Sequence, residues 1–278
     1  MSKPVWYQLL LLATAVTAGV LLVWIGLDAC LSGSVWSGKR ISQSALTGEY
    51  CEFDHVHRFF RQPVNTYSNL AYCWLGALVL GIARYDAKHQ LQPGLNQLAR
   101  FPLLSVLMGV CLVYLGLGSG FFHASLTYVG QRVDMNGTYS VLLTLAGIAL
   151  YHALPTQAIP AAQKNYWVVT LVVLIVLFLK IALWIPSSRL VPALILLLNL
   201  LMIIQYVRFR KVYRPGLILL GLALVVMAIK IRTLDVQKVG CAPHSLFQGH
   251  ALWHLLTALS TFCSYAFFRF TKANRIVT

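Results

Sequence analysis

Residues 249–262 read GHALWHLLTALSTF, a stretch that combines two histidines with a run apolar enough to cross a membrane. His250 and His254 stand four residues apart, so in an α-helix both imidazoles project from one face and can reach the same metal ion. Histidines inside a membrane are costly and usually face a bundle interior or a water-filled cavity. A hydrogen bond to a neighbouring helix is the plain alternative for any single one. The pair nevertheless predicts a buried polar site on a membrane-spanning helix.

The rest of the chain is similarly apolar. Of its 278 residues, 59% are hydrophobic and only 10% are charged, which is far from the composition of soluble globular proteins. A helix needs about 20 apolar residues to cross the hydrocarbon core, and it satisfies its own backbone groups there. Eight runs of about this length occur, near residues 5–27, 65–83, 101–122, 135–154, 166–185, 189–207, 215–231 and 248–268.

These runs predict an all-α membrane protein, a seven-helix bundle with an additional N-terminal helix. We expect this helix to be a retained anchor at residues 1–28, because the run is long for a signal peptide and lacks a clear cleavage site before Asp28. An outer loop is predicted at 29–64, the helical core at 65–270 and a tail at 271–278.

The formal net charge of +15 comes from Lys and Arg residues that lie mainly in short loops and tails, as the positive-inside rule describes. With the N-terminus inside, twelve of them fall on the cytoplasmic side and nine on the outer side. The segment RFRKVYR, residues 208–214, contributes most of this difference. We therefore expect both termini in the cytoplasm, a lipid bilayer as the environment, and no nucleic-acid partner.

His123, in GSGFFHASL, is the best candidate for a third metal ligand, because the predicted topology puts it at the same depth as His250 and His254. Three histidines leave one position of a zinc ion open for water, which is typical of a catalytic site. Asp134 is the best carboxylate for proton transfer, and Ser119 shares the helical face of His123. The alternatives are a helix-start residue for Asp134 and a helix-packing residue for Ser119.

The outer loops hold two further candidates. Glu49, Glu52, Asp54 and Gln62 supply hard oxygen atoms suited to calcium, although an exposed acidic loop explains them nearly as well.

Cys51 and Cys241 lie in two long outer loops, where an oxidising compartment would permit a disulfide, with two free thiols as the alternative.

Trp253 lies between two of the histidines and faces either an acyl chain or a neighbouring helix.

Three blocks carry a family resemblance: CEFDH followed by QPVNTYSNLAY, then GLGSGFFHASLTYVGQRVD, and finally GHALWHLLTALSTF. With these blocks the chain resembles the alkaline ceramidases, within a superfamily of seven-helix membrane hydrolases that includes GPI-lipid remodelling enzymes and the adiponectin-receptor type. The resemblance implies a calcium site in the segment beginning at Glu49 and a Cys51–Cys241 disulfide. It also implies zinc ligation by His123, His250 and His254, with Ser119 and Asp134 beside the metal.

We therefore expect a zinc-dependent hydrolase that cleaves the amide bond of ceramide or a related N-acyl lipid. The alternatives are a lipid ester hydrolase of the same superfamily and a zinc-stabilised lipid receptor without turnover. The chain departs from the family pattern where Gln62 replaces a glutamate and Asp54 replaces an amide ligand. Its extra N-terminal helix and compact loops are typical of a bacterial member, so we expect the bacterial inner membrane, with the zinc site toward the periplasm.

Overall fold

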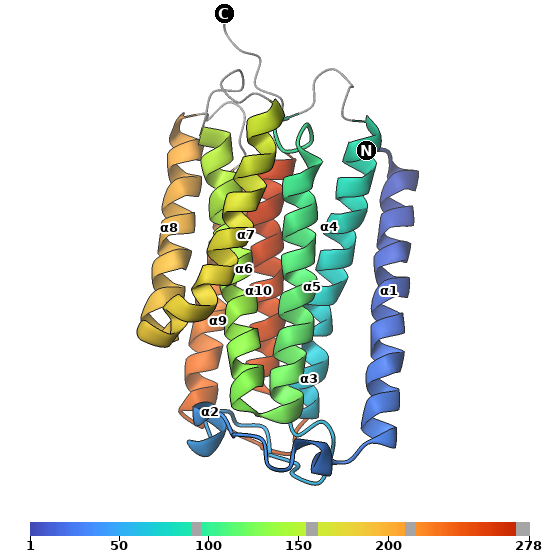
Figure 1. The fold of residues 1–278 in the computed structure, drawn as a ribbon, viewed down its shortest axis with the longest axis vertical. Helices are drawn as coiled ribbons and strands as arrows, with labels where there is room; N and C mark the ends of the chain where they lie inside the picture. The colour runs from blue at the N-terminus through green and yellow to red at the C-terminus, as the bar shows by residue number, and fades with distance from the viewer. Residues whose placement is uncertain (90–95, 154–160, 209–214, 271–278) are drawn as a thin grey trace, which may run out of the picture.

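The computed structural model describes residues 1–89, 96–153, 161–208 and 215–270 and folds them into a bundle of long helices (Figure 1). Eight helices among these residues are long and apolar enough to cross a membrane, which confirms an all-α membrane protein. Residues 209–214 of the basic segment and the predicted tail at 271–278 lie outside the described residues. The helices are α1 (Lys3–Cys30), the 3₁₀ helix η1 (Gly33–Trp36), α2 (Gln43–Leu46), α3 (Pro63–Ser68), α4 (Leu70–His89), α5 (Pro102–Ser125), α6 (Tyr128–Ala153), α7 (Ala161–Trp184), α8 (Ser187–Arg208), α9 (Pro215–Val236) and α10 (Gly249–Arg269).

Each predicted run corresponds to one long helix, with α3 and α4 together forming the second span. The predicted and observed first residues of the helices differ most at α6, which begins at Tyr128 rather than near residue 135. The cause is a tight turn after α5, where Leu126 is left-handed (φ 52°) and Ser125 Oγ accepts a hydrogen bond from the Thr127 N–H at 3.3 Å. Asp134 therefore lies inside α6 instead of at its start, which removes the helix-start interpretation.

Four helices form the buried centre of the bundle. In their most apolar segments, 50% or more of the residues of α4, α5, α6 and α10 are buried, compared with 11% in α1 and α7 and 22% in α8 and α9. The helix α1 contacts α4, while α7 and α8 contact α6, and α9 packs against α10 (Figure 1). The four peripheral helices thus present apolar side chains to the lipid. The four central helices carry the candidate functional residues.

Glycines allow α5 and α6 to approach each other closely. A Cβ atom at Gly137 would lie 2.8 Å from the Leu115 Cα atom, and one at Gly118 would lie 2.9 Å from a methyl group of Val133. Small residues at helix contacts are typical in membranes, where packing replaces the hydrophobic drive for association. This contact sets the distance between the C-terminal half of α5 and Asp134 on α6.

We predict that Gly137→Val lowers the thermal midpoint of the detergent-solubilised protein, because the new side chain would meet the backbone at Leu115. Overpacking of this kind costs about 1–3 kcal/mol. The matched control is Gly26→Val in α1, where an added Cβ has nothing within 4 Å. Equal midpoints for the two variants would contradict the proposed close contact.

Candidate metal centre

Three histidines from two helices converge at one end of the bundle. His123 lies in the last two turns of α5, and His250 and His254 lie in the first two turns of α10, each at most 4% exposed. One ligand atom from each ring lies within 4.8 Å of the others. In the part of the chain that the structure describes, no other group of three or more His, Cys, Asp or Glu side chains converges in this way.

In two of the three rings, a hydrogen bond occupies Nδ1 and leaves Nε2 for a metal ion. Gln62 Oε1 bonds to His123 Nδ1 at 2.9 Å, and Ser68 Oγ bonds to His254 Nδ1 at 2.7 Å. His123 Nε2 and His250 Nδ1 are buried and have no hydrogen-bond partner among the described residues. An unpaired buried polar atom is costly, and metal-bound histidines commonly use their second nitrogen for such a hydrogen bond. These residues therefore fit a metal ion.

Ser119 and Asp134 lie beside the histidines. Ser119 stands one turn before His123, is 2% exposed, and interacts through its side chain with the Asp134 carboxyl group. Both residues line a cavity of about 450 Å³ together with His250 and His254. The cavity thus contains a carboxylate, a hydroxyl group and two of the three candidate metal ligands.

An apolar space adjoins this cavity between α6, α8, α9 and α10. Leu115, Val191 and Trp253 line both spaces, and Leu145 and Met202 line only the apolar one. Trp253 therefore borders the cavity, a position that the sequence did not decide. The combination of a polar end and an apolar extension matches the general anatomy of a lipid-binding site.

Two of the candidate calcium ligands have arginine partners. The Glu49 Oε1 atom accepts a hydrogen bond from Arg232 Nη2 at 2.6 Å. The Asp54 carboxylate forms an ion pair with both Arg61 Nε and Nη2. Each carboxylate is thus neutralised by a cation of the protein itself.

The other two candidate calcium ligands have backbone and histidine partners. Both carboxylate oxygens of Glu52 accept backbone N–H bonds, from Val64 and Asn65, at 2.7 Å each. Burial raises the pKa of Glu52 to about 7, although these two bonds oppose the rise. Gln62 uses its amide oxygen for His123 and donates its amide N–H to the Glu52 carbonyl oxygen at 3.2 Å. Calcium binding stays a prediction, and it would require these groups to exchange partners.

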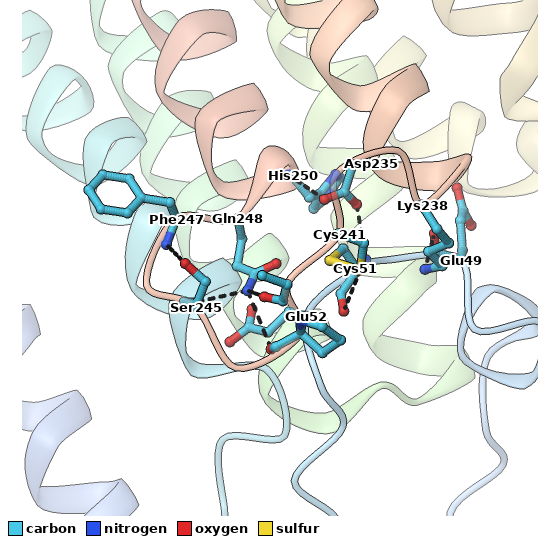
Figure 2. Close-up of a disulfide and its surroundings, with 12 residues drawn as sticks. Glu49, Cys51, Glu52, Asp235, Lys238, Cys241, Ser245, Phe247, Gln248 and His250 are labelled. Atoms are coloured by element: carbon cyan, nitrogen blue, oxygen red, sulfur yellow. Dashed lines mark hydrogen bonds between the residues drawn. A yellow bond between two sulfur atoms is a disulfide. The ribbon is translucent and has the colours of Figure 1, made fainter.

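Cys51 and Cys241 form a disulfide, which confirms that prediction (Figure 2). The bond connects the long loop before α3, predicted above as an outer loop, to the loop between α9 and α10. Asp235 bridges the same segments, because Oδ2 accepts from the Cys51 N–H at 3.1 Å and Oδ1 accepts from the His250 N–H at 3.2 Å. Together they hold the outer loop against the turn of α10 that carries His250.

Three further residues at this end were not selected from the sequence. The Tyr50 ring centroid lies 4.1 Å from that of His250 and 5.1 Å from that of His123. Arg232 lines the cavity, and Asp235 forms the bridge described above. The one available signal was the spacing of Arg232 and Asp235, which are three apart at the end of a predicted span and share a helical face.

A comparison with protein families identifies the family of the chain. The family model described as Ceramidase matches residues 42–276, which include the three histidines and exclude α1. The chain belongs to the ceramidase family. This membership supports a membrane enzyme that hydrolyses the amide bond of ceramide. No curated protein sequence matches the chain significantly.

We predict that replacing both Cys51 and Cys241 with alanine lowers the thermal midpoint in detergent. The cross-link joins residues 190 apart in sequence, and loss of a native disulfide typically costs about 2–5 kcal/mol. Cys30→Ala is the control, because Cys30 is an exposed free thiol. If the double variant and the control unfold at the same temperature, the disulfide does not stabilise the fold.

Proposed function

We propose that this chain is a zinc-dependent membrane amidohydrolase that cleaves ceramide or a related N-acyl lipid. The observation that carries the proposal is the buried convergence of His123, His250 and His254 beside Asp134, in a cavity that adjoins an apolar space. Family membership supports the cleavage of a lipid amide. Three imidazole ligands with room for a further ligand are the donor set of many catalytic zinc sites, which supports the choice of metal.

In this proposal His123 Nε2, His254 Nε2 and His250 Nδ1 would hold the ion. The hydrogen bonds at Nδ1 leave Nε2 of His123 and of His254 available, and His250 Nδ1 is buried without a partner among the described residues. Zinc, when bound, supplies a Lewis acid that polarises the scissile carbonyl and makes water more acidic. Gln62 and Ser68 orient the rings of His123 and His254 through their Nδ1 atoms.

Asp134 and Ser119 carry out the proton and charge chemistry. Asp134 takes a proton from the attacking water and returns it to the nitrogen of the leaving amine. Ser119 donates its hydroxyl hydrogen toward the carbonyl oxygen as negative charge develops there. Both groups line the cavity, where the apolar surroundings strengthen such interactions.

The acyl chain of the lipid occupies the apolar space, and Trp253 contacts the chain where the two spaces meet. In the proposed orientation, the end that carries the metal centre faces the periplasm of a bacterium. The N-terminal end of α1, which lies at the opposite end of the bundle, faces the cytoplasm (Figure 1).

We predict about one tightly bound zinc ion per chain, lost in His123→Ala and in His254→Ala. Elemental analysis of the purified protein measures this directly. His152→Ala is the matched control, because His152 is also a buried histidine but lies near the opposite end of α6. Full zinc content in either ligand variant would remove the assignment of that histidine.

We predict that Asp134→Asn retains zinc but loses turnover by roughly 10²–10⁴-fold, the usual contribution of general acid–base catalysis. The assay uses a panel of lipid amides and esters, with and without a chelator. A variant that hydrolyses every accepted lipid at the parent rate contradicts the mechanism. Hydrolysis of esters alone would identify an ester hydrolase, and a parent protein that turns over no lipid would favour the receptor alternative.

A further inference from the structure

Arg232 carries the only guanidinium or ammonium group among the described residues that line the metal-centre cavity. It belongs to α9, a helix that supplies none of the groups assigned above to metal binding or proton transfer. Its side chain is 39% exposed, so the charge is not sealed inside the protein. A partly exposed guanidinium on the lining of the cavity keeps N–H donors that a ligand can reach, so Arg232 is a candidate for ligand recognition.

The outer loop holds this guanidinium in place. Arg232 Nη2 donates to Glu49 Oε1 at 2.6 Å, and its Cζ atom lies 5.8 Å from the Trp253 ring centroid. The guanidinium also interacts with the Tyr50 hydroxyl group. Glu49 is itself fixed, because Lys238 Nζ donates to its carbonyl oxygen at 3.1 Å beside the disulfide (Figure 2). The position of Arg232 is therefore set by the protein before any ligand binds.

The arrangement of the cavity indicates that the Arg232 guanidinium lies near the headgroup of a bound lipid amide. A lipid amide with its carbonyl at the histidines and its acyl chain in the apolar space leaves its amine part in the remaining polar portion of the cavity. Arg232 and Glu49 line the same cavity together with Ser187 and Ser188, and none of these four groups is assigned to the metal or to proton transfer. The hydroxyl-bearing carbons of a ceramide headgroup are a few bonds from the scissile amide. Arg232 is close to the histidines in turn, because it interacts with Tyr50, whose ring centroid lies 4.1 Å from that of His250.

The charge of the pair indicates the kind of group that it receives. Glu49 neutralises Arg232, so the pair attracts an anion only weakly and suits a neutral polar group. A hydroxyl group complements both members, because it accepts from a guanidinium and donates to a carboxylate. A guanidinium also has several N–H donors, so the bond to Glu49 leaves others for a ligand.

We propose that Arg232, positioned by Glu49, binds a headgroup hydroxyl of the lipid amide and thereby selects hydroxyl-bearing headgroups. This inference rests on the proposed function and names the feature of the substrate that the same cavity recognises. It makes Arg232 a specificity-determining residue, with a role separate from the proton transfer assigned to Asp134.

The test compares ceramide with 1-deoxyceramide of the same acyl chain, which lacks the terminal headgroup hydroxyl. For the parent protein we expect kcat/KM to be about 10–100-fold higher for ceramide, the usual value of a hydrogen bond to a charged group. Arg232→Gln should bring this ratio close to one. The ratio is unaffected by partial misfolding of a variant, because both lipids are assayed on the same preparation.

Lys230→Gln is the matched control. Lys230 is an exposed cation two residues away on α9 and does not line the cavity, so this variant should keep the parent ratio. If the parent protein hydrolyses both lipids equally, this inference is wrong and the proposed function stands. The same holds if the Arg232→Gln variant keeps the parent ratio.

A binding experiment separates this inference from the proposed function. Fluorescent ceramide and 1-deoxyceramide are titrated into zinc-loaded Asp134→Asn protein, with and without the additional Arg232→Gln change. A preference for binding ceramide that is lost in the Arg232→Gln variant supports the inference, even if the parent protein hydrolyses neither lipid. In that case only the proposed function fails. Equal binding of the two lipids when Arg232 is present overturns the inference.

Discussion

A polar group inside a membrane-spanning bundle has no water to bond with, so its partner must come from the protein or from a bound ligand. This constraint organises the end of the bundle that carries the histidines. Gln62 and Ser68 satisfy one nitrogen on each of two rings, and Asp235 satisfies backbone N–H groups of the outer loop and of α10. Among the described residues, the buried ring atoms His123 Nε2 and His250 Nδ1 have no such partner, and a bound cation would meet the same requirement there.

The constraint also fixes α10 along its axis. At the end that carries the histidines, the Asp235 carboxylate and the adjacent disulfide hold the first turn. At the opposite end, Arg269 Nε donates to Asp86 Oδ2 at 2.7 Å, and this carboxylate is only 1% exposed. Breaking a buried ion pair is strongly destabilising, because it leaves an uncompensated charge. A shift of α10 by one residue would disturb both ends, so the histidines keep a defined depth relative to α5.

The sequence predicted what depends on local composition and spacing. The eight spans follow from the length of apolar runs, and the shared face of His250 and His254 follows from their separation of four. The predicted start of the fourth span near residue 135 was wrong, because the turn at Leu126 depends on hydroxyl hydrogen bonds that a pattern of apolar residues does not indicate. The sequence indicates only a calcium ligand at Gln62, because its hydrogen bond to His123, 61 residues away, depends on tertiary packing.

The division between buried and lipid-facing helices explains why the sequence does not indicate a role for Arg232 in the cavity. The histidines, Ser119 and Asp134 lie on the central helices α5, α6 and α10, whose tight contacts hold these side chains in fixed positions. The remaining wall of the cavity comes largely from α8 and α9, which are mostly exposed to lipid. A basic residue near the end of such a helix has the pattern of an ordinary topology signal. The ion pair with Glu49, from a loop 183 residues away, and the place of Arg232 in the cavity lining follow only from the tertiary structure.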